Sequence, residues 1–240
     1  MPMRLIARYT KDERVKYISH LDFMRLLQRT LRRADIPVAY SQGFSPHPKL
    51  SFASALAVGV TSEGEYMDIY LDKEMDPKLF LTRMNEKLPL GIRFMEAVTL
   101  QAKIPSLMSL IERAEYRISL SHKPFWGRNI VELIQKFMSR GEILFTRVNK
   151  RGRNQVDIRK MIHNIRLTEQ SEEKIVLDVV LSTGSRANLR PEHLIEALFD
   201  FINVEPNPEL NLGIHRRDLY LNKNGAWISP KGLGGGQEID

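Results

Sequence analysis

The chain has 240 residues, of which 42% are hydrophobic and 27% charged, and this composition excludes a disordered chain, a collagen and a coiled coil. The absence of cysteine excludes a disulfide framework, a thiolate zinc site, an iron–sulfur cluster and a cysteine nucleophile. The net charge of +7 favours a polyanionic partner. Because no apolar stretch is long enough for a signal peptide or a membrane span, we expect a cytoplasmic protein without a membrane partner.

Basic residues are concentrated in two segments. Residues 1–50 contain ten basic and four acidic side chains, whereas residues 51–110 contain six and eight. The second basic segment, residues 142–162, has few acidic side chains, and its basic members are Arg147, Lys150, Arg151, Arg153, Arg159 and Lys160. Each half of the chain therefore carries one basic patch.

The first hundred residues predict two helices and several strands. Ser19 and Asp22 form a variant of the capping box, which starts a helix, and Pro37 stops it. The expected elements are, in chain order, a strand at 5–10, this helix, a strand at 37–42, a loop, an apolar stretch from residue 50 that turns at 62–64 into an alternating strand, a helix from Asp76 to Pro89 and a strand at 92–100.

A similar order follows in the second half, so we expect an α+β protein of two ferredoxin-like (β-α-β-β-α-β) domains in tandem. The elements expected there are strands at 114–121, 142–148, 156–170, 174–183 and 214–222, with helices at 127–140 and 191–202. The predicted domains are residues 1–101 and 114–230, joined by a connector at 102–113 and followed by a flexible tail at 231–240. The glycines of that tail precede no helix, so they do not predict a phosphate-binding loop.

The first helix carries four arginines on one side. At 100° per residue they fall within about a 100° arc opposite Leu27 and Leu31. Arginine binds phosphate through two hydrogen bonds and stacks on bases, so the arc suits a helix lying along an RNA backbone. A solvated helix face is the alternative. The four residues are Arg25, Arg29, Arg32 and Arg33.

The segment YSQGFSPHPKLSF (40–52) combines aromatic, amide and basic side chains with Gly43, Pro46 and Pro48. Prolines restrict such a loop before it binds, and aromatic rings can stack on unpaired bases. We therefore predict RNA contacts here, with a purely structural loop as the alternative. The candidate residues are Tyr40, Gln42, Phe44, His47 and Lys49, together with Phe52.

His20 lies at the start of the first helix, near Tyr17, and this pair offers the one candidate for acid–base chemistry. A histidine in a first helical turn also suits a simple surface or packing role. The six histidines show no spacing typical of a metal site, so the sequence indicates neither metal nor cofactor.

Two segments of the second half carry further basic candidates. NKRGRNQ (149–155) is typical of a hairpin tip and presents Lys150, Arg151 and Arg153. The segment before the helix at Pro191 places Arg186 and Arg190 where they would hold a phosphate, with a structural cap as the alternative.

Several motifs resemble the radical SAM-linked protein family, a domain of unknown function: SHLDFMRLLQRTLRRA (19–34), PVAYSQGFSPHPKLSFASALAVGVTSEGEYMDIYL (37–71), VDIRKMI (156–162) and GSRANLRPEHL (184–194). The resemblance implies an association with cobalamin-binding radical SAM proteins. Because a radical SAM enzyme needs three cysteines for its cluster, this chain would be the companion of such an enzyme. The doubled domain order is also similar to that of CRISPR repeat-associated RNA-binding proteins, some of which cleave RNA with a histidine near the first helix.

These observations predict an RNA-binding accessory protein of a radical SAM enzyme that modifies RNA, with tRNA or rRNA as its partner and no catalysis of its own. A metal-independent endoribonuclease using His20 and Tyr17 is one alternative. A protein–protein scaffold without nucleic acid is another.

Overall fold

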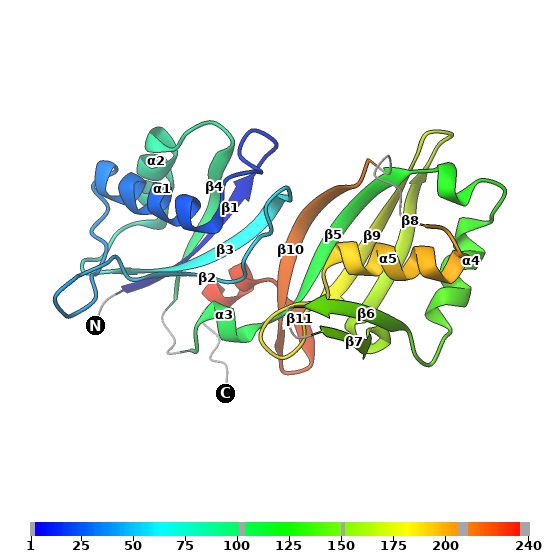
Figure 1. The fold of residues 1–240 in the computed structure, drawn as a ribbon. Helices are drawn as coiled ribbons and strands as arrows, with labels where there is room; N and C mark the ends of the chain where they lie inside the picture. Colours follow the sequence, from blue (N-terminus) through cyan, green and yellow to red (C-terminus); the bar gives the residue numbers. More distant parts are fainter. Residues whose placement is uncertain (1–2, 101–103, 150–151, 206–210, 236–240) are drawn as a thin grey trace. The chain divides into compact units, whose positions relative to one another are not determined.

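The computed structural model describes residues 3–100, 104–149, 152–205 and 211–235 (Figure 1). The chain is an α+β protein whose strands pair mostly antiparallel. It divides into two compact units, one made of Met1–Glu112 with Arg216–Asp240 and the other of Arg113–His215. Strand β10 (Gly213–Lys223) therefore begins in the second unit and ends in the first. No helix within the described ranges is long and apolar enough to cross a membrane.

The first unit is a sheet with two helices on one face (Figure 1). Strands β4, β1 and β3 lie in that order, and both β2 and β10 are neighbours of β3. Through residue 100 the element order β-α-β-β-α-β is the one predicted. The strand predicted at 37–42 is wrong, however, because this segment forms only isolated bridges at Val38 and Tyr40, and the second strand of the order lies at Leu50–Phe52. The elements are β1 (Met3–Lys11), α1 (His20–Arg33), β2 (Leu50–Phe52), β3 (Thr61–Leu71), α2 (Pro77–Lys87), β4 (Ile92–Leu100), α3 (Leu107–Leu110), β11 (Ala226–Ile228) and the 3-10 helix η4 (Pro230–Gly235).

Helix α1 begins and packs as its sequence predicts. The Ser19 hydroxyl accepts a hydrogen bond from the Asp22 amide at 3.2 Å, which caps the helix. Its side chains Phe23, Leu27 and Leu31 are buried in the core, where the ring of Phe23 stacks on that of Tyr9 with centroids 5.5 Å apart. Burying this face leaves the opposite side of α1, with its arginines, in solvent.

The turn predicted at residues 62–64 is wrong, because these residues lie inside β3. Gly64 is needed there for another reason. A Cβ atom at this position would overlap the backbone carbonyl of Arg217 in β10 and lie 2.6 Å from the Asp218 Cα. The glycine therefore permits two strands to approach closely rather than breaking one of them.

Residues 231–235 do not form the flexible tail that was predicted for 231–240. Residues up to 235 form η4, in which Leu233 is buried and Gly234 lies so close to Val98 of β4 that a Cβ atom would collide with it. Lys231 also forms an ion pair with Glu96 at 3.4 Å. The domain division consequently differs from the predicted one: residues 216–235 belong with the N-terminal unit. Residues 236–240 lie outside the described ranges.

The second unit has the strand order β10-β5-β9-β8 and contains the α-helices α4 and α5 (Figure 1). Strands β6 and β7 pair with each other in a separate two-stranded sheet. The stretch predicted as one strand at 156–170 is divided by a 3-10 turn. The elements are β5 (Ile111–Ser121), η1 (Lys123–Phe125), α4 (Ile130–Met138), β6 (Leu144–Asn149), β7 (Gly152–Asp157), η2 (Arg159–Met161), β8 (Ile162–Gln170), β9 (Lys174–Ser182) and α5 (Pro191–Ile202).

Candidate nucleic-acid interface

The four arginines of α1 are all exposed. Arg25 forms an exposed ion pair with Asp22 at 3.3 Å, which leaves most of its guanidinium in solvent. Arg33 donates hydrogen bonds to the Lys87 carbonyl at 3.0 Å and to the Thr30 hydroxyl at 3.3 Å. The side chains of Arg29 and Arg32 form no hydrogen bond or ion pair with the other described residues. These two guanidiniums are thus available to an outside anion.

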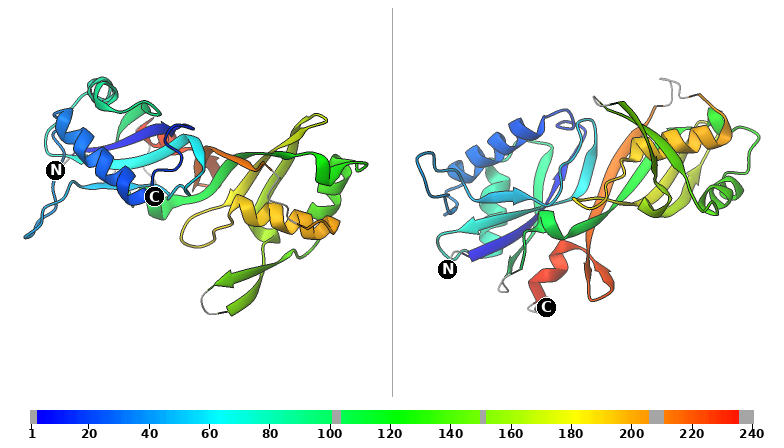
Figure 2. Two further views of the ribbon diagram at one scale, coloured as in Figure 1. Left: turned by 45° about the horizontal axis from the view of Figure 1, so that its top comes forward. Right: turned by 60° about the horizontal axis from the view of Figure 1, so that its bottom comes forward.

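The loop between α1 and β2 projects from the first unit and is closed at its base (Figure 2). The Ser41 hydroxyl and His47 Nδ1 are 2.9 Å apart, the Ser41 amide donates to the His47 carbonyl, and Tyr40 forms a β-bridge with Pro48. His47 therefore stabilises the base of this loop through its hydrogen bonds to Ser41, although its side chain remains exposed.

The tip of the same loop presents an aromatic ring to solvent. Phe44 is fully exposed, next to Gly43, whose φ of +123° suits a residue without a side chain. Gln42 and Lys49 are exposed as well, and Tyr40 is 43% exposed. Phe52 is the exception among the predicted contacts. It is 5% exposed and belongs to the core, where its ring packs against Tyr9 and Phe23.

His20 and Tyr17 are both exposed, and no hydrogen bond joins them within the described residues. The His20 ring packs edge-on to Phe52, with centroids 5.0 Å apart. A cavity of about 20 Å³ beside it has room for about one water molecule, too little for a nucleotide. Lys11 lines this cavity and donates to the carbonyls of Lys16 and Ile18, and burial lowers the pKa of Lys11.

The predicted basic residues of the second unit are only partly described. Lys150 and Arg151 lie outside the described residues. Arg153 is exposed on β7, in the hairpin that extends from this unit (Figure 2). Arg190 is the exposed residue before the first turn of α5.

Arg186 lines a cavity of about 290 Å³ between the β6–β7 hairpin and the segment 184–190. Arg147 of β6 and His193 of α5 line the same cavity. The sequence reasoning selected Arg186 but missed His193, because a histidine two residues inside a helix carries no local signal of the strand that it faces.

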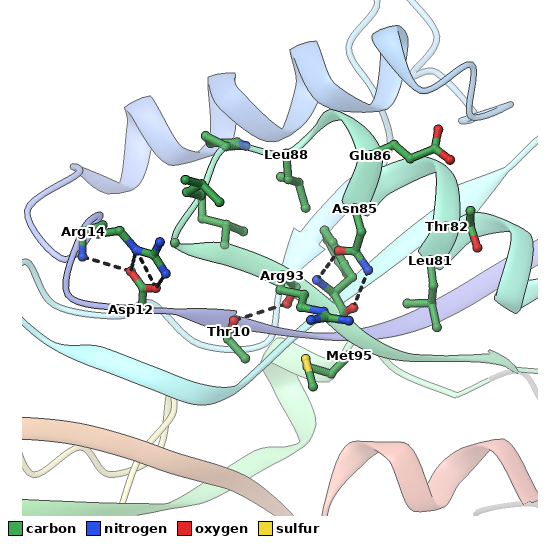
Figure 3. A pocket seen from close by; sticks show the side chains of 15 residues that line it. Thr10, Asp12, Arg14, Leu81, Thr82, Asn85, Glu86, Leu88, Arg93 and Met95 are labelled. Atoms are coloured by element: carbon green, nitrogen blue, oxygen red, sulfur yellow. Dashed lines mark hydrogen bonds and ion pairs between the residues drawn. The ribbon is translucent and has the colours of Figure 1, made fainter.

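A larger, open hollow of about 830 Å³ lies in the first unit beside α2 and β4 (Figure 3). Its charges are balanced: Asp12 and Glu86 accompany Arg14 and Arg93, and Asp12 is already paired with Arg14. The Asn85 amide pairs with both backbone groups of Phe94, at 2.8 and 2.9 Å. Since β4 ends the sheet order, Asn85 occupies hydrogen-bonding groups that an additional strand would use. No motif in the sequence indicated this hollow.

The described residues contain no cluster of three or more His, Asp or Glu side chains suited to a metal ion. The geometry thus offers exposed guanidiniums on α1, an exposed aromatic loop, and a separate arginine-lined cavity.

Comparison with known proteins identifies the family. The model of the family described as "Uncharacterized protein conserved in bacteria (DUF2344)" matches residues 4–191, and the chain belongs to this family. No curated protein matches it. A solved chain from the "Crystal Structure of a Cbf5-Nop10-Gar1 Complex" is similar, with a TM-score of 0.50 and 11% identity. The match covers 90% of this chain and 48% of that one, so this chain spans about half of its length, and the likeness concerns the fold alone.

Proposed function

We propose that this member of the DUF2344 family is an RNA-binding accessory protein. The observation that carries the proposal is the exposed arginine face of α1, in which the side chains of Arg29 and Arg32 form no hydrogen bond or ion pair with the other described residues. Two neighbouring guanidiniums of this kind, one helical turn apart, favour a ligand with repeated anionic groups. The backbone of RNA is such a ligand.

The aromatic loop supports RNA over other polyanions. The ring of Phe44 is fully exposed at the tip of a loop that hydrogen bonds hold together. Exposing this apolar surface to water is unfavourable, and stacking it on an unpaired base is favourable. The bracing by Ser41 and His47 reduces the conformational entropy that Phe44 loses on binding. Phosphate contacts from α1 and base stacking from the loop are complementary modes of single-strand recognition.

The accessory role comes from the resemblance to the radical SAM-linked family. We propose a radical SAM enzyme that modifies tRNA or rRNA as the partner, with this chain binding the substrate and supplying no reacting group. Recovery of such an enzyme with the tagged protein, in a cross-linked pull-down, would support this part. A pull-down that contains RNA but no radical SAM protein would contradict it.

We also propose that both units are variants of the ferredoxin-like split β-α-β fold. Supporting this, the strand neighbours β4-β1-β3 with β2 beside β3 repeat as β10-β5-β9-β8 in the second unit. The β6–β7 hairpin is then an insertion after α4.

The RNA proposal is tested by measuring the affinity of the full chain for labelled tRNA and rRNA fragments at about 50 mM salt. The variant R25Q/R29Q/R32Q should bind at least tenfold more weakly. The control K73Q/K78Q/K87Q removes the same number of exposed charges from the same unit and should bind within about twofold of wild type. Equal losses in both variants would indicate attraction by net charge alone, and no measurable wild-type affinity would favour the scaffold.

The absence of catalysis is tested separately. Metal-independent cleavage needs one group to accept the 2′-hydroxyl proton and another to protonate the leaving oxygen, and each contributes about 10²–10⁴ in rate. We expect bound RNA to stay intact with EDTA-treated protein. Products with 2′,3′-cyclic phosphate ends that disappear in His20→Ala would instead establish the endoribonuclease.

A further inference from the structure

Large apolar side chains are exposed where α1 begins. Tyr17 is 73% exposed, Leu21 in the first turn is 61% exposed, and Val58 in the connection between β2 and β3 is 57% exposed. The Gly59 amide donates to the Lys16 carbonyl at 2.9 Å, which holds the two connections side by side. Single exposed apolar side chains are ordinary, but several that lie together indicate a binding surface.

The ring of Tyr17 is held in place but remains open to solvent. Lys16 Nζ lies over the ring, 5.2 Å from its centroid, and pairs with Glu13 at 2.6 Å. Gly59 borders the ring on another side: a Cβ atom there would lie 3.9 Å from Tyr17 Cε1, and the φ of +87° suits a residue without a side chain. An aromatic ring that is both oriented and exposed offers a flat surface for stacking.

This apolar surface continues into the arginine face of α1. At 100° per residue, Leu21 lies about 20° to 80° around the helix from three of the arginines: Arg25, Arg29 and Arg32. The charge of Arg25 is compensated by Asp22 at 3.3 Å, whereas Arg29 and Arg32 lie one and two turns farther along and their side chains form no such pair. The face therefore changes from apolar to cationic along the helix, which suits a ligand with a flat apolar group followed by anionic groups.

The second exposed aromatic ring of this unit follows the other end of α1. Figure 1 shows the connection from β1 and the loop toward β2, which carries Phe44, at opposite ends of the helix. The helix has 14 residues and is about 21 Å long at 1.5 Å per residue. At about 3.4 Å per nucleotide, the spacing in a stacked strand, about six nucleotides cover this length. A strand that follows α1 from Tyr17 thus needs about this length to approach the loop.

We propose that the ring of Tyr17 and the arginine face of α1 form one site for an unpaired RNA strand of about six nucleotides. One base stacks on Tyr17, beside Leu21. The phosphates that follow it lie at Arg29 and Arg32, and a base at the other end of the strand reaches Phe44. This inference rests on the proposed function and names its substrate class, because the bases of a duplex stack on each other and present no face to Tyr17.

The first test measures the affinity of the full chain for oligouridylates from the dinucleotide to the dodecanucleotide, and for an RNA duplex. Affinity should rise up to about the hexanucleotide, and the duplex should bind more weakly than a single strand of its length. Tyr17→Ala should weaken binding of the hexanucleotide by about 5- to 150-fold, the value of one base on one aromatic ring. Tyr17→Phe keeps the ring and should bind like wild type. The control Trp126→Ala removes an aromatic ring that is 60% exposed in the other unit, and should leave the affinity unchanged.

The second test uses the wild-type chain, so it does not depend on the folding of a variant. The hexanucleotide carries 4-thiouridine at its first or at its last position, is cross-linked by light, and the modified peptide is identified by mass spectrometry. One label should attach to the peptide that contains Tyr17 and the other to the peptide that contains Phe44. Labels that attach equally to both peptides, or to neither, would overturn the proposed path of the strand.

The inference and the proposed function can fail separately. Wild-type affinity in Tyr17→Ala, or equal losses in Tyr17→Ala and Tyr17→Phe, would overturn the stacking, and the proposed function would stand if R25Q/R29Q/R32Q binds weakly. A duplex bound as tightly as the single strand would overturn the substrate class. Full affinity in R25Q/R29Q/R32Q with a loss in Tyr17→Ala would contradict the arginine contacts and support the stacking. No affinity of wild type for any of these probes would overturn both.

Discussion

Glu65 and Arg216 are 151 positions apart in the sequence and form a fully buried ion pair. Arg216 Nε donates to Glu65 Oε1 at 2.7 Å, and the two side chains are 2% and 1% exposed. Arg216 Nη1 also donates to the Ser54 hydroxyl and the Ala55 carbonyl, each at 3.3 Å. These bonds link β10 to the N-terminal unit. They fix the start of the described segment 216–235 in that unit.

The first prediction concerns this pair. Glu65→Gln removes the charge that compensates Arg216, and an uncompensated buried guanidinium should lower the free energy of unfolding by about 3–5 kcal/mol. Urea unfolding measures the loss. Glu132→Gln removes a carboxylate from an exposed i,i+4 pair with Lys136 and should leave the unfolding midpoint almost unchanged. Similar midpoints for the two variants would show that the Glu65–Arg216 pair does not hold β10.

The second prediction concerns Gly64. Gly64→Ala should destabilise the protein by about 1–3 kcal/mol or more, because the added methyl group meets the Arg217 backbone, which cannot move without disturbing β10. Thermal unfolding measures this. Gly141→Ala is the control, since its methyl group would have no heavy atom within 4 Å. A Gly64→Ala protein as stable as wild type would contradict the close approach of the two strands.

The third prediction is a pH dependence. Hydrogen bonds from the amides of Ile143 and Arg159, each 2.9 Å long, lower the pKa of Asp157 from 3.8. A lowered carboxyl pKa stabilises the fold above the unfolded-state value, and this stability is lost as pH falls through the folded-state value. Asp157→Asn should therefore have a lower melting temperature than wild type at neutral pH.

This difference should close as the pH falls below 3.8. Asp72→Asn, at an exposed side chain, shows how much the loss of one acidic charge changes the melting temperature by itself. A difference for Asp157→Asn that is the same at neutral and acid pH would contradict the role of its charge.

The fourth prediction concerns the loop tip. Phe44→Ala should lower RNA affinity by about 1–3 kcal/mol, the value of one base stacked on one aromatic ring, without changing the melting temperature. Leu90→Ala, which truncates another exposed apolar side chain of the same unit, should change neither. An unchanged affinity for Phe44→Ala would remove base stacking from the account of this loop.

Local sequence signals predicted the helices well. Ser19 with Asp22, and Asp76 with Pro77, start helices where expected, because capping is decided by neighbouring residues. The roles of two glycines were predicted wrongly because these roles depend on residues far away in the sequence. Gly64 and Gly234 accommodate partners more than 100 residues away, so a local reading of Gly64 as a turn and of Gly234 as a flexible tail had no means of finding β10 or β4.

The same distinction between local and long-range signals applies to the candidate sites. The arginine arc of α1 could be predicted because helical periodicity alone places four side chains on one face, and the buried opposite face confirms that geometry. The cavity of the second unit could not, since Phe145 and His193 are 48 positions apart and meet only through tertiary packing. Phe52 was wrongly predicted to contact RNA. The composition of the segment 40–52 does not distinguish an exposed aromatic side chain such as Phe44 from a buried one such as Phe52.

The most direct test of the account is the salt dependence of RNA affinity for wild type and for R25Q/R29Q/R32Q. If the three arginines contact phosphates, the slope of log K against log salt should be shallower in the variant by about 2, at roughly 0.7 per contact on single strands. K73Q/K78Q/K87Q should keep the wild-type slope. Identical slopes for wild type and R25Q/R29Q/R32Q would show that α1 does not contact RNA, and would contradict the proposed function.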